Sequence, residues 1–267
     1  MKARINDIEI AYDDHGVGHP LIFLHAFPLN RGMWSGLITA LLSDQRYRLV
    51  ALDWRGFGES EVGVGDEIST MELLADDVAG LMDRLGMQQA ALCGLSMGGY
   101  VAFAFLRKYP QRVNGLILAD TRPTPDTEEG RANREKVAQL ALSQGPAAIA
   151  DLQIPNLLSS TTRQQHPEVE IQVRQMINAA TPSGIAAASR GMAQRVDATD
   201  LLAGITCPTL VVAGEDDQLT PPSVARDYAS KIPGAHFAAI PQAGHLTNLE
   251  QPEAFLATVR AFLQTAL

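Results

Sequence analysis

The chain has 267 residues, of which 46% are hydrophobic and 19% are charged, as is typical of a globular protein with a large core. Its net charge of −9 argues against nucleic acid as a partner. The amino-terminal residues lack the apolar core of a signal peptide and no apolar run is long enough to span a bilayer, so we expect a cytoplasmic protein with no membrane partner.

Short apolar runs alternate with helical stretches along most of the chain. The Asn6-Asp7 pair separates two extended segments and predicts a hairpin. The strands are expected at residues 2–5, 8–14, 21–24, 47–53, 91–93, 113–120, 209–214 and 235–240, and the helices near 34–42, 71–85, 97–108, 222–231 and from 252 onward. This alternation predicts an α/β fold with a mostly parallel, eight-stranded sheet that is covered by helices on both faces.

The pattern changes between Asp120 and about Val196, where the apolar spacing is helical and prolines recur. We predict three or four short helices here, inserted after the sixth strand as a lid over the carboxyl edge of the sheet. An extra helical layer with no role in substrate access is the alternative. Residues 1–120 and 197–267 would then form the core domain, and residues 121–196 the helical cap.

The segment Gly94-Leu95-Ser96-Met97-Gly98 lies between a predicted strand and a predicted helix. So tight a turn strains the backbone of its central residue, and small residues two places on either side relieve the collisions. The turn would lift the Ser96 hydroxyl clear of the sheet and aim the Met97 amide at a developing oxyanion. We therefore predict that Ser96 is a nucleophile, against the alternative of a surface serine in a glycine-rich turn.

A serine nucleophile needs a base that accepts its proton. Of the six histidines, His245 follows the last predicted strand, in a loop that should emerge at the same edge as Ser96. His25 is expected to brace its own loop by hydrogen bonding. The remaining histidines are expected at the surface, at a helix boundary or within a strand, namely His15, His19, His166 and His236.

The base needs an acid that orients it, and three aspartates are candidates. Asp216 and Asp217 follow the strand at residues 209–214, and neighbouring side chains in a loop point apart, so one of them should reach His245. Asp120 ends the strand before the cap and would face the same edge. We favour Asp217 over Asp216, and both over Asp120. The order Ser, Asp, His in the chain then matches the order expected for this kind of site.

A second oxyanion donor is expected from the loop after residues 21–24, where the amide of Ala26 or Phe27 would point at the nucleophile. No strand-turn-helix unit carries a dinucleotide-binding fingerprint, and the two cysteines, Cys93 and Cys207, make no metal-ligand cluster. We therefore expect no nicotinamide, flavin or metal cofactor.

Taken together, these motifs resemble the α/β-hydrolase family over essentially the whole chain. The matching pieces are HAFP, DWRGFGES, GLSMGG, GEDDQLTPP and AGHLTNLEQPEAF. In that family the acid follows a glycine by three positions, which implies Asp217 after Gly214, and the oxyanion amides carry over to Ala26 or Phe27 and to Met97. Among family members, the chain is most similar to the branch of the 3-oxoadipate enol-lactonases and small carboxylesterases.

The resemblance implies a serine hydrolase that cleaves small to medium carboxylic esters or lactones through an acyl-enzyme. The alternatives are a 3-oxoadipate enol-lactonase, a cofactor-free perhydrolase or haloperoxidase, a carbon–carbon bond hydrolase and a non-catalytic ligand receptor. An enol-lactone that carries carboxylates would need a cation in the pocket, which Arg190 or Arg195 would supply unless they lie on the solvated surface. The residues expected to line an apolar pocket, or else the core, are Trp34, Ile154, Leu157, Met192 and Leu246.

Overall fold

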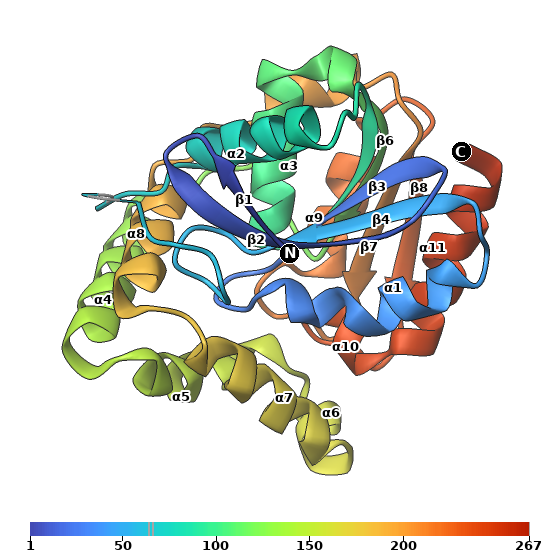
Figure 1. Ribbon diagram of the computed structural model, residues 1–267. Coiled ribbons are helices and arrows are strands. Elements are labelled where there is room, and N and C mark those ends of the chain that lie inside the picture. The colour runs from blue at the N-terminus through green and yellow to red at the C-terminus, as the bar shows by residue number, and fades with distance from the viewer. Residues whose placement is uncertain (64, 66, 267) are drawn as a thin grey trace.

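A twisted sheet of eight strands forms the centre of the molecule in this computed structural model, which describes residues 1–63, 65 and 67–266 (Figure 1). The strand order is β1-β2-β4-β3-β5-β6-β7-β8. Strand β2 runs antiparallel to both of its neighbours, and the other pairs are parallel. The strands are β1 (Lys2–Ile5), β2 (Ile8–Gly16), β3 (His19–Leu24), β4 (Tyr47–Leu52), β5 (Ala90–Leu95), β6 (Val113–Ala119), β7 (Thr209–Gly214) and β8 (His236–Ile240).

The central strands are mostly apolar, as expected for a sheet that helices cover on both faces. Every residue of β5 and of β7 is buried, so neither strand shows the alternation of a half-exposed strand. Strands β1 and β2 form the predicted hairpin at Asn6-Asp7. The predicted α/β fold with a mostly parallel eight-stranded sheet is confirmed.

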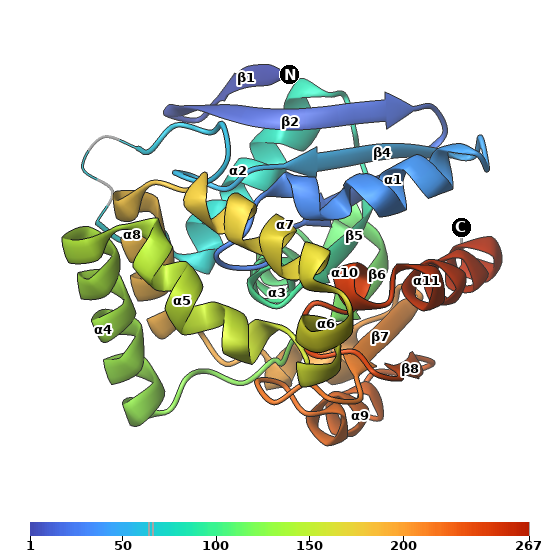
Figure 2. The same ribbon diagram turned by 90° about the horizontal axis from the view of Figure 1, so that it is seen from below.

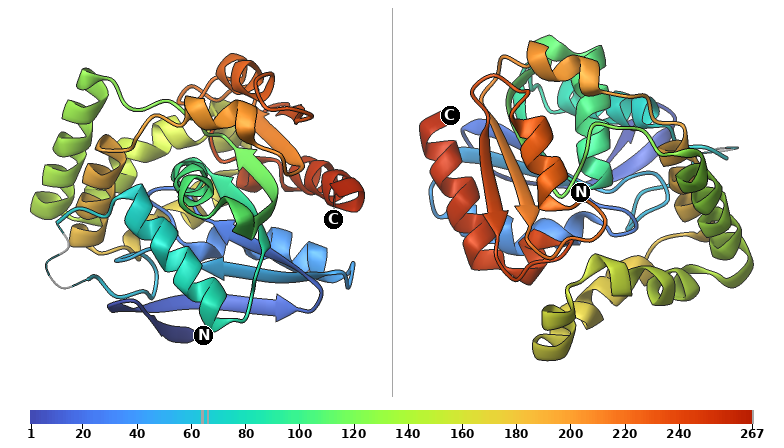
Figure 3. Two further views of the ribbon diagram at one scale, coloured as in Figure 1. Left: turned by 90° about the horizontal axis from the view of Figure 1, so that it is seen from above. Right: turned by 180° about the vertical axis from the view of Figure 1, so that it is seen from behind.

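Two groups of helices pack against the sheet. Helices α1 (Ser35–Leu42) and α11 (Pro252–Ala266) lie together on one face, and α2 (Met71–Arg84) and α3 (Met97–Lys108) lie on the other (Figures 2 and 3). Helix α9 (Pro222–Ala229) packs against β7 and β8. The short helix α10 (Thr247–Glu250) was not predicted, because four residues are too few to show helical spacing.

The cap segment, defined here as residues 121–196, holds five helices where three or four were expected. Three of them begin at a proline. The first turn of a helix tolerates proline because an N–H at that position would have no partner within the helix. The helices are α4 (Glu128–Gln144), α5 (Pro146–Leu157), α6 (Ser160–Gln165), α7 (Pro167–Asn178) and α8 (Pro182–Ala193).

Within the cap segment, α4 and α8 pack side by side, and α5, α6 and α7 extend below the sheet in the view of Figure 1 and face the reader in Figure 2. That this segment is a separate domain which controls access stays a prediction. Within the described part of the chain, no helix combines the length and the apolar character needed to cross a membrane.

Candidate active site

The carboxyl ends of the parallel strands meet at one edge of the sheet. The order of the strands reverses between β3 and β5, and the crevice at such a reversal is where open α/β sheets bind ligands. The loop that begins at His25 leaves β3 there, and Ser96 directly follows β5. The loops that carry Asp217 and His245 follow β7 and β8 at the same edge.

Ser96 occupies the predicted strained turn between β5 and α3, with φ of 54° and ψ of −114°. The glycines around it are needed for close approach. A Cβ on Gly98 would lie 2.0 Å from the carbonyl oxygen of Leu24, and one on Gly94 would lie 2.4 Å from that of Gly98. The turn can therefore form only with residues that lack a side chain at these two positions.

A continuous chain of hydrogen bonds joins three of the predicted residues. The Ser96 Oγ lies 2.8 Å from Nε2 of His245, and Nδ1 of His245 lies 2.8 Å from Oδ2 of Asp217. The exposed fractions of the three residues are only 9%, 3% and 2%. An ionised carboxylate only accepts, so Nδ1 donates to Asp217 and Nε2 is left to accept the hydroxyl proton of Ser96.

Asp217 is fixed by its own loop as well as by His245. Its Oδ1 accepts hydrogen bonds from the amides of Leu219 and Thr220, at 2.8 and 3.0 Å, and its Oδ2 accepts one from the Thr220 hydroxyl. Thr220 was missed by the sequence analysis, although an aspartate three residues before a threonine is a familiar turn pattern. Asp216 is exposed, and its side chain makes no hydrogen bond to His245.

Asp120, the third candidate acid, serves a different contact. It is fully buried, and its carboxylate accepts from the amide of Gly214 at 2.9 Å and from the hydroxyl of Thr247 at 2.6 Å. It therefore ties the ends of β6 and β7 to the start of α10, and makes no hydrogen bond to His245.

The side chains of His245, Asp217 and Asp120 shift one another's pKa. Burial by itself would lower the pKa of His245, but the charge and hydrogen bond of Asp217 outweigh it and raise that pKa above its usual value. Burial would raise the pKa of Asp217, but the charge of His245 and the hydrogen bonds from His245 and Thr220 hold it below its usual value. Burial raises the pKa of Asp120, and the charge of Asp217 adds to the rise.

The loop after β3 brings a second backbone amide to the site. The Ala26 amide donates to the sulfur of Met33 at 3.3 Å and is thereby turned away from an oxyanion. Among the described residues, neither the Phe27 amide nor the Met97 amide, which begins α3, donates a recorded hydrogen bond to another protein group. Phe27 lines the same cavity as Ser96, and Met97 directly follows Ser96 in the chain, so these two amides stay the candidate oxyanion donors.

His25 braces this loop, as expected from the sequence. Its ring is fully buried, with Nδ1 2.9 Å from the carbonyl oxygen of Ala26 and Nε2 3.1 Å from the amide of Trp54. Burial lowers the pKa of His25 to about 3, so the ring is neutral at pH 7 and both hydrogen bonds persist. His25 is thus a structural residue.

A cavity of about 110 Å³ opens onto Ser96 and His245. Of the predicted pocket residues, Leu157 and Met192 line it, and Trp34, Ile154 and Leu246 do not. For Trp34 the alternative of core packing holds: its ring lies 5.3 Å from Phe23 and 6.3 Å from Phe255 between ring centres. The full lining is Phe27, Ser96, Tyr100, Arg122, Arg134, Gln153, Leu157, Met192, Leu219, Thr220 and His245.

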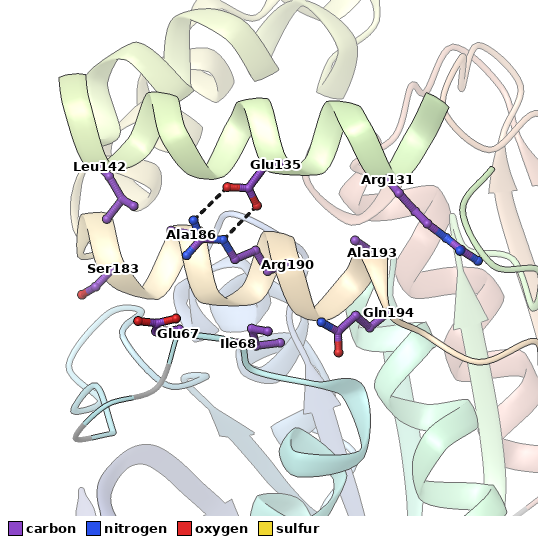
Figure 4. A pocket seen from close by; sticks show the side chains of 10 residues that line it. All are labelled: Glu67, Ile68, Arg131, Glu135, Leu142, Ser183, Ala186, Arg190, Ala193 and Gln194. Carbon is purple, nitrogen blue, oxygen red and sulfur yellow. Dashed lines mark hydrogen bonds and ion pairs between the residues drawn. The ribbon is translucent and has the colours of Figure 1, made fainter. Parts of the chain in front are cut away.

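The two arginines proposed as cations in the pocket lie elsewhere. Arg190 extends from α8 to Glu135 on α4 and makes two contacts of 2.9 Å, in a groove away from Ser96 (Figure 4). Arg195 is buried, pairs with Asp126 at 2.8 Å and stacks on the ring of Tyr100 at 4.2 Å. Neither lines the cavity.

Two other arginines, Arg122 and Arg134, line the cavity and were missed. Arg122 follows the carboxyl end of β6 by three residues, which was a usable signal. Arg134 lies within α4, and nothing in the sequence marks which face of that helix turns to the site.

The cap segment is bonded directly to the loop that carries His245. The backbone amide of His245 donates to the carbonyl oxygen of Leu157 at 3.1 Å. Glu250, buried at the end of α10, accepts from the amide of Ser159 at 2.8 Å and from the hydroxyl of Thr162 at 2.7 Å. The position of His245 thus depends on the turn between α5 and α6.

Comparisons with known proteins identify the family of this fold. The alpha/beta hydrolase fold family matches residues 19–252. A 3-oxoadipate enol-lactonase of Acinetobacter baylyi is 29% identical over 245 residues, which are 92% of this chain and 88% of the relative.

Two solved structures are similar over nearly the full length. A thermophilic esterase from Thermogutta terrifontis has a TM-score of 0.96 and 45% identity, covering 100% of this chain and 99% of its own. An enol-lactonase from Burkholderia xenovorans has a TM-score of 0.90 and 29% identity, covering 99% and 100%. From the family match and these likenesses, the chain belongs to the family of the alpha/beta hydrolase fold.

Proposed function

We propose that this protein hydrolyses small to medium carboxylic esters or lactones through an acyl-enzyme on Ser96. The observation that carries the proposal is the unbroken hydrogen-bonded chain from Ser96 through His245 to Asp217, which ends at a cavity. Relatives named as an esterase and as enol-lactonases support the same class of substrate.

In the first half of the reaction, Ser96 Oγ adds to the ester carbonyl carbon while Nε2 of His245 takes the hydroxyl proton. The oxyanion that forms accepts hydrogen bonds from the Phe27 and Met97 amides. Each such donor typically contributes about 100-fold or more to turnover. Collapse then breaks the bond to the leaving oxygen, which receives the proton from His245, and the acyl group stays on Ser96.

In the second half, His245 takes a proton from water, and the resulting hydroxide adds to the acyl carbon. Collapse breaks the bond to Ser96 Oγ, the proton returns to that oxygen, and the carboxylic acid leaves. Asp217 stays ionised throughout and stabilises the imidazolium, consistent with the lowered pKa of its carboxyl group.

The size of the cavity favours short acyl groups. At about 110 Å³ it is well below the roughly 300–1,000 Å³ of pockets that enclose drug-sized ligands. Its lining combines apolar side chains such as Leu157 and Met192 with a few polar groups.

Hydrolysis of p-nitrophenyl acetate and butyrate by the wild type and by Ser96→Ala tests the proposal. The variant should lose about 10⁴-fold or more in kcat, because the remaining amides and binding contacts cannot replace the nucleophile. Ser43→Ala, which alters an exposed serine after α1, is the matched control and should leave kcat unchanged. A wild type without turnover would favour the non-catalytic receptor, and a Ser96→Ala variant as active as the wild type would exclude the mechanism.

A further inference from the structure

Beside the catalytic cavity, one carboxylate is shared by three guanidinium groups. Asp126 is buried and lies 2.8 Å from Arg195, 3.0 Å from Arg134 and 3.3 Å from Arg122. Burial opposes its ionisation, but hydrogen bonds and charge from the arginines hold the pKa of Asp126 at about 2. Since arginine does not deprotonate in proteins, three guanidinium groups and one carboxylate give this cluster a net charge of +2.

Arg122 contributes least to holding Asp126 and has a donor to spare. Its contact with Asp126 is the longest of the three, and its Nε is buried without any hydrogen-bond partner. Arg195, in contrast, also bonds two carbonyl oxygens and stacks on Tyr100, so it holds the Asp126 carboxylate without help from Arg122. The Arg122 side chain is 33% exposed and lines the cavity, so a ligand bound there can contact its guanidinium group.

Arg122 and Arg134 stand where the catalytic cavity meets a larger groove. This outer groove, of about 630 Å³, lies between α4 and α5 and also carries Lys136. The two spaces share four lining residues and therefore adjoin, and the shared residues are Arg122, Arg134, Gln153 and Leu219. A substrate that reaches Ser96 from this groove passes both guanidinium groups.

We propose that Arg122 and Arg134 bind a carboxylate of the substrate, so that the site prefers esters and lactones which carry a free carboxylate near the scissile bond. The inference rests on the proposed function, because it assumes that Ser96 attacks a carbonyl in the same cavity. The preference acts against the overall charge of −9, which repels anions, so it must arise from the local excess of arginine.

Two pairs of esters, each with an anionic and a neutral member, test the preference. In the first pair, monomethyl glutarate carries a carboxylate on the acyl side and dimethyl glutarate is neutral. In the second pair, acetoxyacetate carries a carboxylate on the alcohol side and 2-methoxyethyl acetate is neutral. In at least one pair, kcat/KM should favour the anionic member by about 10- to 100-fold, the range expected for hydrogen bonds to a charged group. Equal or better use of the neutral member in both pairs would refute the inference.

The variant Arg122→Gln should lower that ratio by about 10-fold or more, with Arg134→Gln as an independent second variant. Arg131→Gln is the matched control: it removes the same charge from α4, but Arg131 is exposed and lines the separate groove of Figure 4, so the ratio should not change. If Arg131→Gln lowers the ratio of kcat/KM equally, the preference comes from the overall charge of this face of the protein, and the inference is refuted.

A measurement on the wild type needs no variant. Glutarate should competitively inhibit the hydrolysis of p-nitrophenyl acetate, and glutaramide, its neutral counterpart, should not. If p-nitrophenyl acetate is hydrolysed but glutarate does not inhibit and neither anionic ester is preferred, this inference fails alone. If p-nitrophenyl acetate is not hydrolysed, the proposed function itself fails.

Discussion

Replacing Asp217 by asparagine changes which ring nitrogen of His245 carries the proton, while the shape of the site is kept. Asp217 Oδ1 accepts from the amides of Leu219 and Thr220, so the carbonyl oxygen of asparagine would take that place. The NH2 group then faces Nδ1 of His245, which must accept instead of donate. The imidazole proton moves to Nε2, where it blocks transfer from Ser96.

The cost of this wrong tautomer is about 10⁴-fold in kcat where the same substitution has been made in a serine protease triad. At about 1.36 kcal/mol for each factor of ten, it corresponds to about 5.5 kcal/mol of lost transition-state stabilisation. Initial rates with p-nitrophenyl butyrate measure the loss, and thermal unfolding shows that the variant is folded.

Two neighbouring aspartates serve as controls. Asp216→Asn alters an exposed side chain and should leave kcat within about twofold of the wild type, as is usual for surface positions. Asp120→Asn alters a buried carboxylate that bonds Gly214 and Thr247, so its effect should fall mainly on stability. A loss of less than tenfold in Asp217→Asn, or an equal loss in Asp216→Asn, would refute the assignment.

Two further predictions concern pH and stability. Asp217 raises the pKa of His245, and His245 must be neutral to act as the base, so kcat/KM should rise with pH through a midpoint above 6.5. Asp217→Asn should lower that midpoint. An unshifted midpoint would contradict the effect of Asp217 on the pKa of His245. Glu250→Gln places an NH2 group among three hydrogen-bond donors, so the free energy of unfolding measured in urea should fall by about 2–3 kcal/mol. The exposed Glu253→Gln is the control and should change it little. Equal effects of the two substitutions would contradict the assigned role of Glu250.

The features predicted well from the sequence are those set by local geometry. The turn at Ser96 requires Gly94 and Gly98 within two residues of it, so the requirement is written in adjacent positions. The central strands are likewise marked by unbroken apolar runs. The choice of Asp217 over Asp216 followed from the family spacing, because the two side chains cannot be told apart by burial patterns alone.

The errors came from contacts between distant parts of the chain. Trp34 looks like a pocket residue beside a catalytic loop, but Phe255 from the last helix covers it. Arg195 was expected on the solvated surface or in the pocket, but it is buried and pairs with Asp126, 69 positions earlier. Such partners are decided by how the helices of the cap segment turn against the sheet, which apolar periodicity does not specify.

The bonds that join Leu157, Ser159 and Thr162 to His245 and Glu250 limit how this enzyme can be recombined with its relatives. Helix α5 lines the cavity through Gln153 and Leu157 and also accepts the hydrogen bond from the His245 amide, so a change in this helix alters the cavity and the position of His245 together. A chimaera that receives only residues 121–196 from a relative would lose the matched fit between the turn after α5 and the segment of His245 and Glu250. Exchange of the two segments together would preserve it.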